Sequence, residues 1–167
     1  MRKDTLVAAA YEAGLLGFAA LLGYFLHSPL IFTSLGPTAY EMIETPTRPS
    51  ARTYNVLVGH SVGIVAGLVA LGSSHAWAEP AVSLHGVPLQ HVVAVLIAGF
   101  LTVVGTLMLK ATQPASLSTT LLIGLGTMQT WHAVLSIAVS VGVMAADSPY
   151  PGASYGDLDL SGVASEK

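Results

Sequence analysis

The stretch HVVAVLIAGFLTVVGTLML, residues 91–109, holds no Asp, Glu, Lys or Arg over 19 positions and is rich in Val and Leu. About 20 apolar residues suffice for a helix to cross the hydrocarbon core of a bilayer. Residues 91–109 belong to one of four long ranges without charge, which are 13–40, 53–78, 80–109 and 111–146. Four such ranges in 167 residues leave no room for a separate soluble domain, so we expect one polytopic membrane unit.

The overall composition supports this interpretation and argues against several function classes. Hydrophobic residues make up 53% of the chain and charged residues 9%, whereas soluble domains carry about 25% charged residues. The net charge of −3 offers no basic surface for nucleic acid. There is no cysteine, and no phosphate loop, HExxH or dinucleotide glycine motif is present. We therefore expect neither an enzyme nor a bound cofactor or metal.

The pattern of breaks predicts an all-α membrane protein with four full transmembrane helices and two short helices broken by Pro or Gly. We expect the full helices at about 5–27, 54–71, 89–110 and 131–146, and the short ones at 37–45 and 114–127. Residues 72–90 are expected to form a loop. The range 1–146 is then the transmembrane domain, and 147–167 is a polar tail without helical periodicity.

The two halves of this domain, about 5–71 and 89–146, share one plan: a long helix, a short broken helix and a further helix. This likeness indicates an internal duplication, although chance Pro and Gly breaks would produce the same pattern. If both short pieces cross the membrane, all the cations outside the tail fall on one side, as the positive-inside rule requires. Residues 115–128 are short for a full crossing, so crossing and re-entry both remain open.

The starts of the two short helices are the candidate binding site. A helix start inside a membrane presents unpaired backbone N–H groups and the positive end of the helix dipole, which together attract anions. Around the first break lie Ser34, Gly36 and Thr38, and around the second lie Gln113 and Ser116. We expect the two starts to meet and to bind a small anion through these donors. The alternative is that the breaks only shape helix packing.

Helix 54–71 contributes the remaining candidates. His60 lies deep in an uncharged segment, after Asn55, and a titratable group there is a functional candidate by default. A structural histidine is nearly as consistent with the sequence. Glycines repeat every fourth residue at Gly59, Gly63 and Gly67, and this stripe is expected to pack on another helix. The spacing of His75, His85 and His91 matches no zinc pattern.

Three motifs resemble the HPP family of small integral membrane proteins: SLGPTA at 34–39, the prolines and alanine at 46, 49 and 51, and NVLVGH at 55–60. The family motif PRNxxGGH keeps its asparagine, second glycine and histidine at Asn55, Gly59 and His60. Tyr54 and Val58 replace its arginine and first glycine, and TQPA at 112–115 stands where the family has His-Pro-Pro. Cyanobacterial and chloroplast members are associated with nitrite transport, so the resemblance implies a nitrite-like substrate.

These observations predict a multi-pass protein of the plasma membrane that transports a small monovalent anion. Nitrite is the first candidate, and nitrate, formate and halide follow. The alternatives are a membrane-embedded sensing or interaction module without transport, and a proton-coupled cation carrier that uses Glu12 and His60. The small-residue stripes also suit contacts between subunits, so we expect a homo-oligomer in the lipid bilayer.

Overall fold

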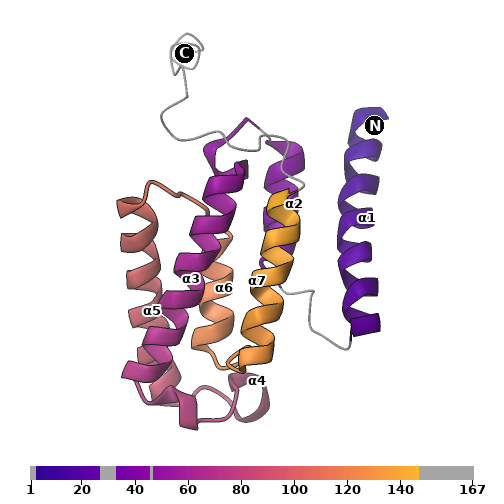
Figure 1. Cartoon of the computed structure of the whole chain (residues 1–167). Coiled ribbons are helices and arrows are strands. Elements are labelled where there is room, and N and C mark those ends of the chain that lie inside the picture. Colours follow the sequence, from indigo (N-terminus) through magenta and orange to yellow (C-terminus); the bar gives the residue numbers. More distant parts are fainter. Residues whose placement is uncertain (1–2, 27–32, 46, 147–167) are drawn as a thin grey trace.

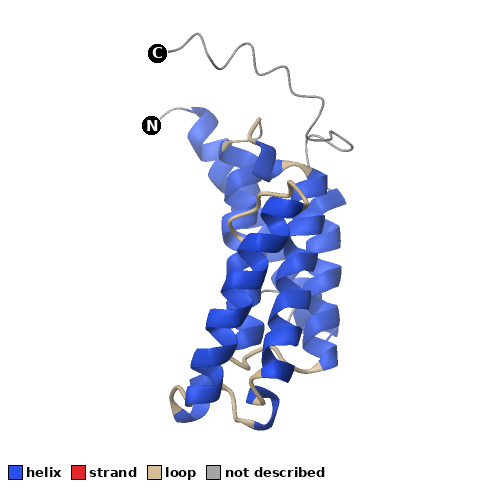
Figure 2. Ribbon diagram, turned by 90° about the vertical axis from the view of Figure 1, so that its left-hand side faces the viewer, coloured by secondary structure: helices blue, strands red, loops and turns tan. Residues whose placement is uncertain are grey.

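The computed structural model of the chain describes residues 3–26, 33–45 and 47–146, and every regular element in these ranges is helical (Figures 1 and 2). The all-α prediction is thus confirmed. The elements in chain order are α1 (Lys3–Leu26), α2 (Leu35–Glu44), η1 (Pro49–Ala51), α3 (Thr53–Ser73), η2 (Ala76–Ala78), α4 (Val82–His85), α5 (Leu89–Met108), α6 (Ser116–Gly124) and α7 (Trp131–Ala146). The predicted tail, 147–167, lies outside the described residues.

The element lengths follow the breaks in the sequence. The helices α2 and α6 have 10 and 9 residues, against 21 for α3 and 20 for α5. The predicted 72–90 loop contains two short helical turns, η2 and α4, and its ends belong to α3 and α5. One or two turns of helix satisfy backbone polar groups that an open loop would leave unpaired.

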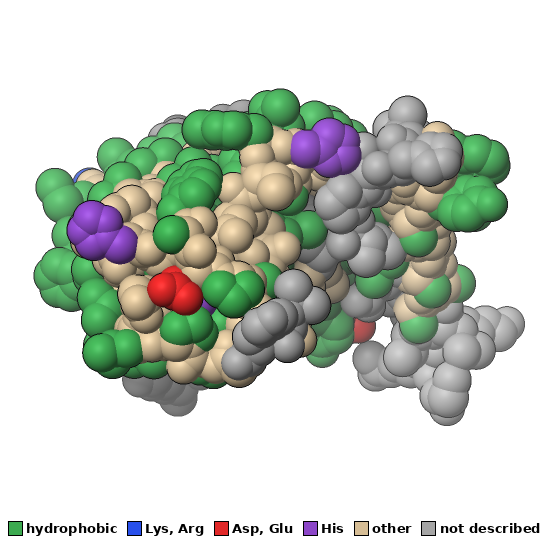
Figure 3. Space-filling view, turned by 90° about the horizontal axis from the view of Figure 1, so that it is seen from below, with side chains coloured by type: hydrophobic (Ala, Val, Ile, Leu, Met, Phe, Trp, Pro, Cys, Tyr) green, Lys and Arg blue, Asp and Glu red, His purple; other side chains and the backbone are tan. Residues whose placement is uncertain are grey.

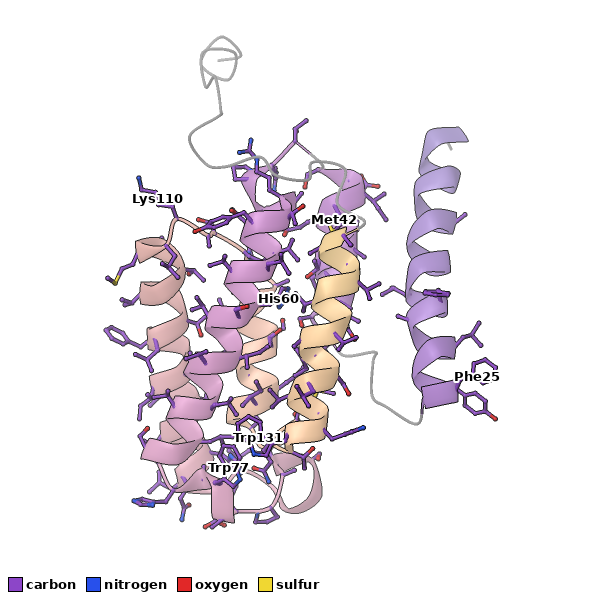
Figure 4. The ribbon with its side chains drawn as sticks, viewed as in Figure 1. Phe25, Met42, His60, Trp77, Lys110 and Trp131 are labelled. Carbon is purple, nitrogen blue, oxygen red and sulfur yellow. The ribbon has the colours of Figure 1, made fainter. Side chains whose placement is uncertain are left out.

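Hydrogen bonds between elements fix the two ends of the bundle. The Tyr54 hydroxyl donates to Leu109 O (2.9 Å) and the Thr53 hydroxyl to Ala145 O (3.3 Å), so the start of α3 lies beside the ends of α5 and α7. We call this the cationic end, because Arg48, Arg52 and Lys110 lie in its loops. In Figure 4, Lys110 and Met42 lie at this end, and Trp77 and Trp131 lie at the opposite one, the tryptophan end.

The two short helices run in opposite directions from the interior. The chain passes from the end of α2 through η1 into the start of α3, so α2 runs toward the cationic end. At the tryptophan end, Val82 N–H donates to Leu125 O (3.1 Å) just beyond the end of α6. The helix α6 therefore runs toward the tryptophan end.

Large apolar side chains are exposed on the outside of the bundle, while several polar side chains are buried together with an apolar core. On α5, Leu96, Phe100 and Leu107 are 69%, 68% and 64% exposed, whereas Asn55, His60 and Thr119 are at most 1% exposed. Hydrophobic side chains also lie along the upper and left edges of the face in Figure 3. The helices α3 and α5 are both long and apolar enough to cross a membrane.

Candidate functional site

Four side chains from three helices form a buried hydrogen-bonded ring, which we call the His60 ring. The His60 Nδ1 atom lies 2.7 Å from Thr119 Oγ1 on α6, and its Nε2 atom lies 3.1 Å from Thr38 Oγ1 on α2. Ser34 Oγ lies 2.7 Å from Thr119 Oγ1, and the Thr38 hydroxyl donates to Ser34 O at 2.7 Å. None of the four residues is more than 1% exposed. His60 is the eighth residue of α3, about 10 Å along the helix from its start.

The proton positions in the ring follow from its geometry. Each hydroxyl has a single proton. Since the Thr38 hydroxyl donates to Ser34 O, its oxygen must accept from His60 Nε2–H. A neutral imidazole that is protonated at Nε2 accepts at Nδ1, so the Thr119 hydroxyl donates to Nδ1 and accepts from the Ser34 hydroxyl. Neutral His60 therefore closes one directed chain that begins and ends on Ser34.

The glycine stripe of α3 brings α6 close enough for this ring to form. An added Cβ at Gly59 would lie 2.6 Å from Gln113 Cβ, at Gly63 2.7 Å from Ser116 O, and at Gly67 2.8 Å from Ile123 Cβ. Any side chain at these positions would push α6 away. The prediction that the stripe packs on another helix is confirmed, and the partner helix is α6 together with the residues that precede it.

The segment before α6 holds a buried amide without a partner. Gln113 is 3% exposed, and neither its Nε2 nor its Oε1 atom has a hydrogen-bond partner within the described ranges. Its backbone is fixed, because the Ser116 hydroxyl donates to Gln113 O at 2.6 Å and Asn55 Nδ2 donates to the neighbouring Thr112 O at 3.1 Å. A carboxamide in this position can both donate and accept.

The two short helices meet at their starts, through the side chains of Ser34 and Thr119. Ser34 is the residue before α2, and its contact Thr119 is the fourth residue of α6. The first residue of α6, Ser116, therefore lies about 4.5 Å nearer to the cationic end than this contact. Hence the start of α2 faces the tryptophan end, and the start of α6 faces the cationic end.

The backbone amides at the two starts differ. In the first turn of α6, N–H groups already donate, from Ser116 to Gln113 O (3.0 Å), from Leu117 to Pro114 O (3.2 Å) and from Ser118 to Ala115 O (3.1 Å). The expectation of unpaired amides is wrong for α6, because tight turns satisfy them. Among the bonds between described residues, the first one into α2 comes with Thr38 N–H, which donates to Ser34 O at 3.3 Å. Residues 27–32, which precede the turn at 33–34, lie outside the described residues.

The predicted candidates thus have different surroundings. The structure joins Ser34, Thr38 and His60 in the ring, and places Gly59 and Gln113 in contact with each other. Asn55 and Ser116 hold the backbone of 112–113, while Gly36 is half-buried, with no heavy atom within 4 Å of an added Cβ.

Sequence reasoning missed the residue that joins the two short helices, Thr119. A neighbour, Thr120, bonds Thr102 of α5 (2.8 Å), and both are buried. The run Ser-Thr-Thr at 118–120 within an apolar segment was the available signal, because a buried hydroxyl requires a partner.

The histidines outside α3 do not form a second site. His91 is fully buried at the start of α5, where its ring nitrogens lie 2.8 Å from Gly124 O and 3.2 Å from Pro80 O. His75 is exposed. Within the described ranges, no group of three or more His, Asp or Glu residues is placed to hold a metal ion. The side chain of Glu12 and all of His27 lie outside what the structure describes.

No family model, curated protein or solved structure matches the chain. The resemblance to the HPP family therefore stays a prediction that depends on the quoted motifs.

Proposed function

We propose that the protein is a multi-pass protein of the plasma membrane that transports a small monovalent anion, with nitrite as the first candidate. In this proposal α1, α3, α5 and α7 span the bilayer, and α2 and α6, each with the residues that precede it, complete two further crossings. The halves 5–71 and 89–146 are then two repeats with inverted orientation. The large exposed apolar side chains, the buried polar ones and the two long apolar helices support this arrangement.

The distribution of cations supports a definite orientation. Arg48, Arg52 and Lys110 belong to loops at the same end of the bundle, and the described part of α1 begins at that end in Figure 1. Under the positive-inside rule the cationic end faces the cytoplasm. The tryptophan end, with Trp77 and Trp131, then lies at the opposite interface, where aromatic side chains are common.

One observation carries the functional proposal: Gln113 is buried just before the start of α6, and neither of its amide atoms has a partner among the described residues. A buried polar group without a partner costs about 1–3 kcal/mol. A transported ion or its water shell would remove this cost during passage. The Gln113 amide would then meet the anion on the cytoplasmic side of the His60 ring.

The chemistry of the site favours a small, weakly held anion. The amides of Leu35 and Gly36, the Ser34 hydroxyl and the positive end of the α2 dipole are donors without fixed charge on the other side of the ring. Binding by dipoles compensates the desolvation of an anion without trapping it, as conduction requires. The resemblance to the HPP family adds nitrite as the specific expectation.

The direct test is uptake of nitrite by liposomes that contain the purified protein, compared with uptake of nitrate, formate, chloride and potassium. We expect the double variant Thr38→Val with Gln113→Leu to lose most nitrite uptake, because the first change opens the His60 ring and the second removes the Gln113 amide. A matched control is Gln90→Leu, the same side-chain change at the start of α5 at the tryptophan end.

Two results would refute this proposal. Uptake equal to that of protein-free liposomes for every anion would remove transport and favour the sensing or interaction module. Unchanged nitrite uptake in the double variant would show that the anion passes elsewhere and that the helix breaks only shape packing.

A further inference from the structure

The His60 ring has two possible hydrogen-bond directions, and the protonation state of His60 selects between them. In the neutral ring the Ser34 hydroxyl donates to Thr119, and Thr119 donates to Nδ1. If Nδ1 gains a proton, it becomes a donor and Thr119 Oγ1 must accept from it. The Thr119 proton then turns to Ser34 Oγ, and the Ser34 proton must find an acceptor outside the ring.

The released Ser34 proton lies at the start of α2, where the proposed anion would bind. Ser34 is the residue before the first turn of α2, and the Leu35 and Gly36 amides follow it directly. An anion at this start would accept a hydrogen bond from the Ser34 hydroxyl. While His60 is neutral, this hydroxyl donates to Thr119 instead. Binding of the anion and protonation of His60 therefore favour each other, as linkage requires.

We propose that the proton is the co-transported ion of this protein and that His60, through Thr119 and Ser34, couples its uptake to anion binding at the start of α2. This inference rests on the proposed function and adds its coupling ion. The step is a proton transfer alone: Nδ1 accepts one proton, and no covalent bond to the anion forms. One proton moves with one monovalent anion, so the net charge carried is zero.

Within residues 3–26, 33–45 and 47–146, the hydrogen bonds of the His60 ring join no charged side chain that could replace the anion. The imidazole nitrogens are bonded to Thr38 and Thr119. Helix α6 carries no ionisable side chain, and the other ionisable groups of the elements around α3 lie toward the two ends. At the cationic end they are Tyr40, Glu41, Glu44, Arg48, Arg52, Tyr54 and Lys110, and at the tryptophan end they are His75, Glu79, His91 and His132.

Along α2, Tyr40 is exposed, and Glu41 lies one turn beyond Thr38 toward the cationic end. One carboxylate oxygen of Glu41, Oε2, is buried without a partner among the described residues. Glu41 thus lies between the cationic end and the ring. This is the side on which the anion would meet the Gln113 amide.

The first experiment measures the protonation of His60 directly and does not require transport. In protein labelled with ¹⁵N at histidine, the imidazole shifts report which nitrogen carries the proton, and His60→Gln identifies the His60 signals among the six histidines. We expect neutral His60 with the proton on Nε2. Added nitrite should raise the pH at which Nδ1 takes up its proton, and Thr119→Val should abolish this shift while Ser118→Ala preserves it. A neutral form protonated at Nδ1, or no nitrite effect in the native protein, would overturn the inference.

The second experiment measures proton and anion movement together in liposomes with a trapped pH indicator. We expect nitrite uptake by the native protein to acidify the interior, to rise as the outer pH falls and to be insensitive to an imposed membrane potential. Because nitrous acid crosses bilayers unaided, protein-free liposomes set the background, and nitrate, the anion of a strong acid, provides a second substrate.

In this assay His60→Gln and Thr119→Val should lose the acidification and the pH dependence while some anion uptake persists, and Ser118→Ala should resemble the native protein. Anion uptake without proton uptake in the native protein would overturn the coupling and leave the transport proposal intact. Native-like coupling in Thr119→Val would overturn the relay. If no anion moves at all, both proposals fail together.

Discussion

The two short helices, α2 and α6, follow similar breaks in the sequence, yet their starts differ in structure. At α6 three N–H groups of the first turn already donate to the residues just before the helix, and the Ser116 hydroxyl donates to Gln113 O. At α2 the first bond between described residues arrives with Thr38, and the start is held from outside by the contact between Ser34 and Thr119. The start of α6 is thus closed by its own preceding residues, whereas the start of α2 is bonded to a neighbouring helix.

The position of proline explains part of this difference. Pro37 is the third residue of α2, where its missing N–H is one of those that no helix bonds internally. Pro114 precedes the residue before α6, so every residue of α6 keeps its N–H and a tight turn can form. Proline thus stands inside the first turn of α2 and outside that of α6. The packing also differs, since α6 lies against the glycine stripe of α3 in addition to its hydrogen bonds.

The largest expected effect tests the packing of α6. In Gly63→Leu the new Cβ would lie 2.7 Å from Ser116 O and 2.9 Å from Thr120 Oγ1, so α6 must move away from α3. Overpacking at such a contact costs about 3 kcal/mol or more. We expect a lower melting temperature or no folded protein in detergent. The control is Gly99→Leu on α5, where no heavy atom lies within 4 Å of an added Cβ. A native melting temperature and elution volume for Gly63→Leu would contradict the packing argument.

The next effect tests the hydrogen bonds that hold α2. Thr119→Val leaves His60 Nδ1 and Ser34 Oγ without their common partner, and a buried group left unpaired costs about 1–3 kcal/mol. Ser34→Ala removes one of these contacts, so the two changes should be non-additive in a double-mutant cycle. Unfolding free energies of the single and double variants measure the coupling. Additive effects would show that Ser34 and Thr119 do not join the two helices.

Much of the fold was predictable from the sequence, because helix positions follow from charge-free runs and breaks. The Gly59, Gly63 and Gly67 stripe predicted a close helix contact, and the structure supplies the identity of its partner, α6. Which helix packs there depends on contacts between distant segments, and no local pattern encodes this. The turns η2 and α4 were not predicted, because the Pro and Gly residues of 72–90 are as typical of an irregular loop as of short helical turns.

The candidate site was predictable in its members and only partly in its arrangement. Ser34, Thr38 and His60 were all selected by residue type, but the partner that unites them, Thr119, lies 59 residues after His60. The overlap of the two helix starts by about one turn also depends on the stagger of α3 and α6 along the glycine stripe. Stagger is set by packing, and the sequence carries no periodic signal for it.

A moderate effect is expected at the start of α6, where one substitution should change transport without lowering stability. In Gln113→Leu a buried amide without partners is replaced by an apolar group, so the unfolding free energy should stay the same or rise by about 1 kcal/mol. Nitrite uptake should fall in the same variant. Asn55→Leu is the contrasting control, because it deletes the bond to Thr112 O and should lower the melting temperature. Should Gln113→Leu destabilise the protein as much as Asn55→Leu, the Gln113 amide has a structural partner and is not available to an anion.

The smallest effect on stability tests whether the start of α2 is open to an anion. Gly36 is the second residue of α2, it is half-buried, and no heavy atom lies within 4 Å of an added Cβ. Since alanine is a better helix former than glycine, Gly36→Ala should raise the unfolding free energy by up to about 1 kcal/mol. If an anion approaches the Leu35 and Gly36 amides during transport, the methyl group obstructs it, and nitrite uptake falls although the protein is more stable. Gly142→Ala on α7, where an added Cβ also meets nothing within 4 Å, should have a similar effect on stability and leave uptake unchanged. Equal uptake by both variants would mean that no ion approaches the backbone at the start of α2, and the proposed anion site there would be wrong.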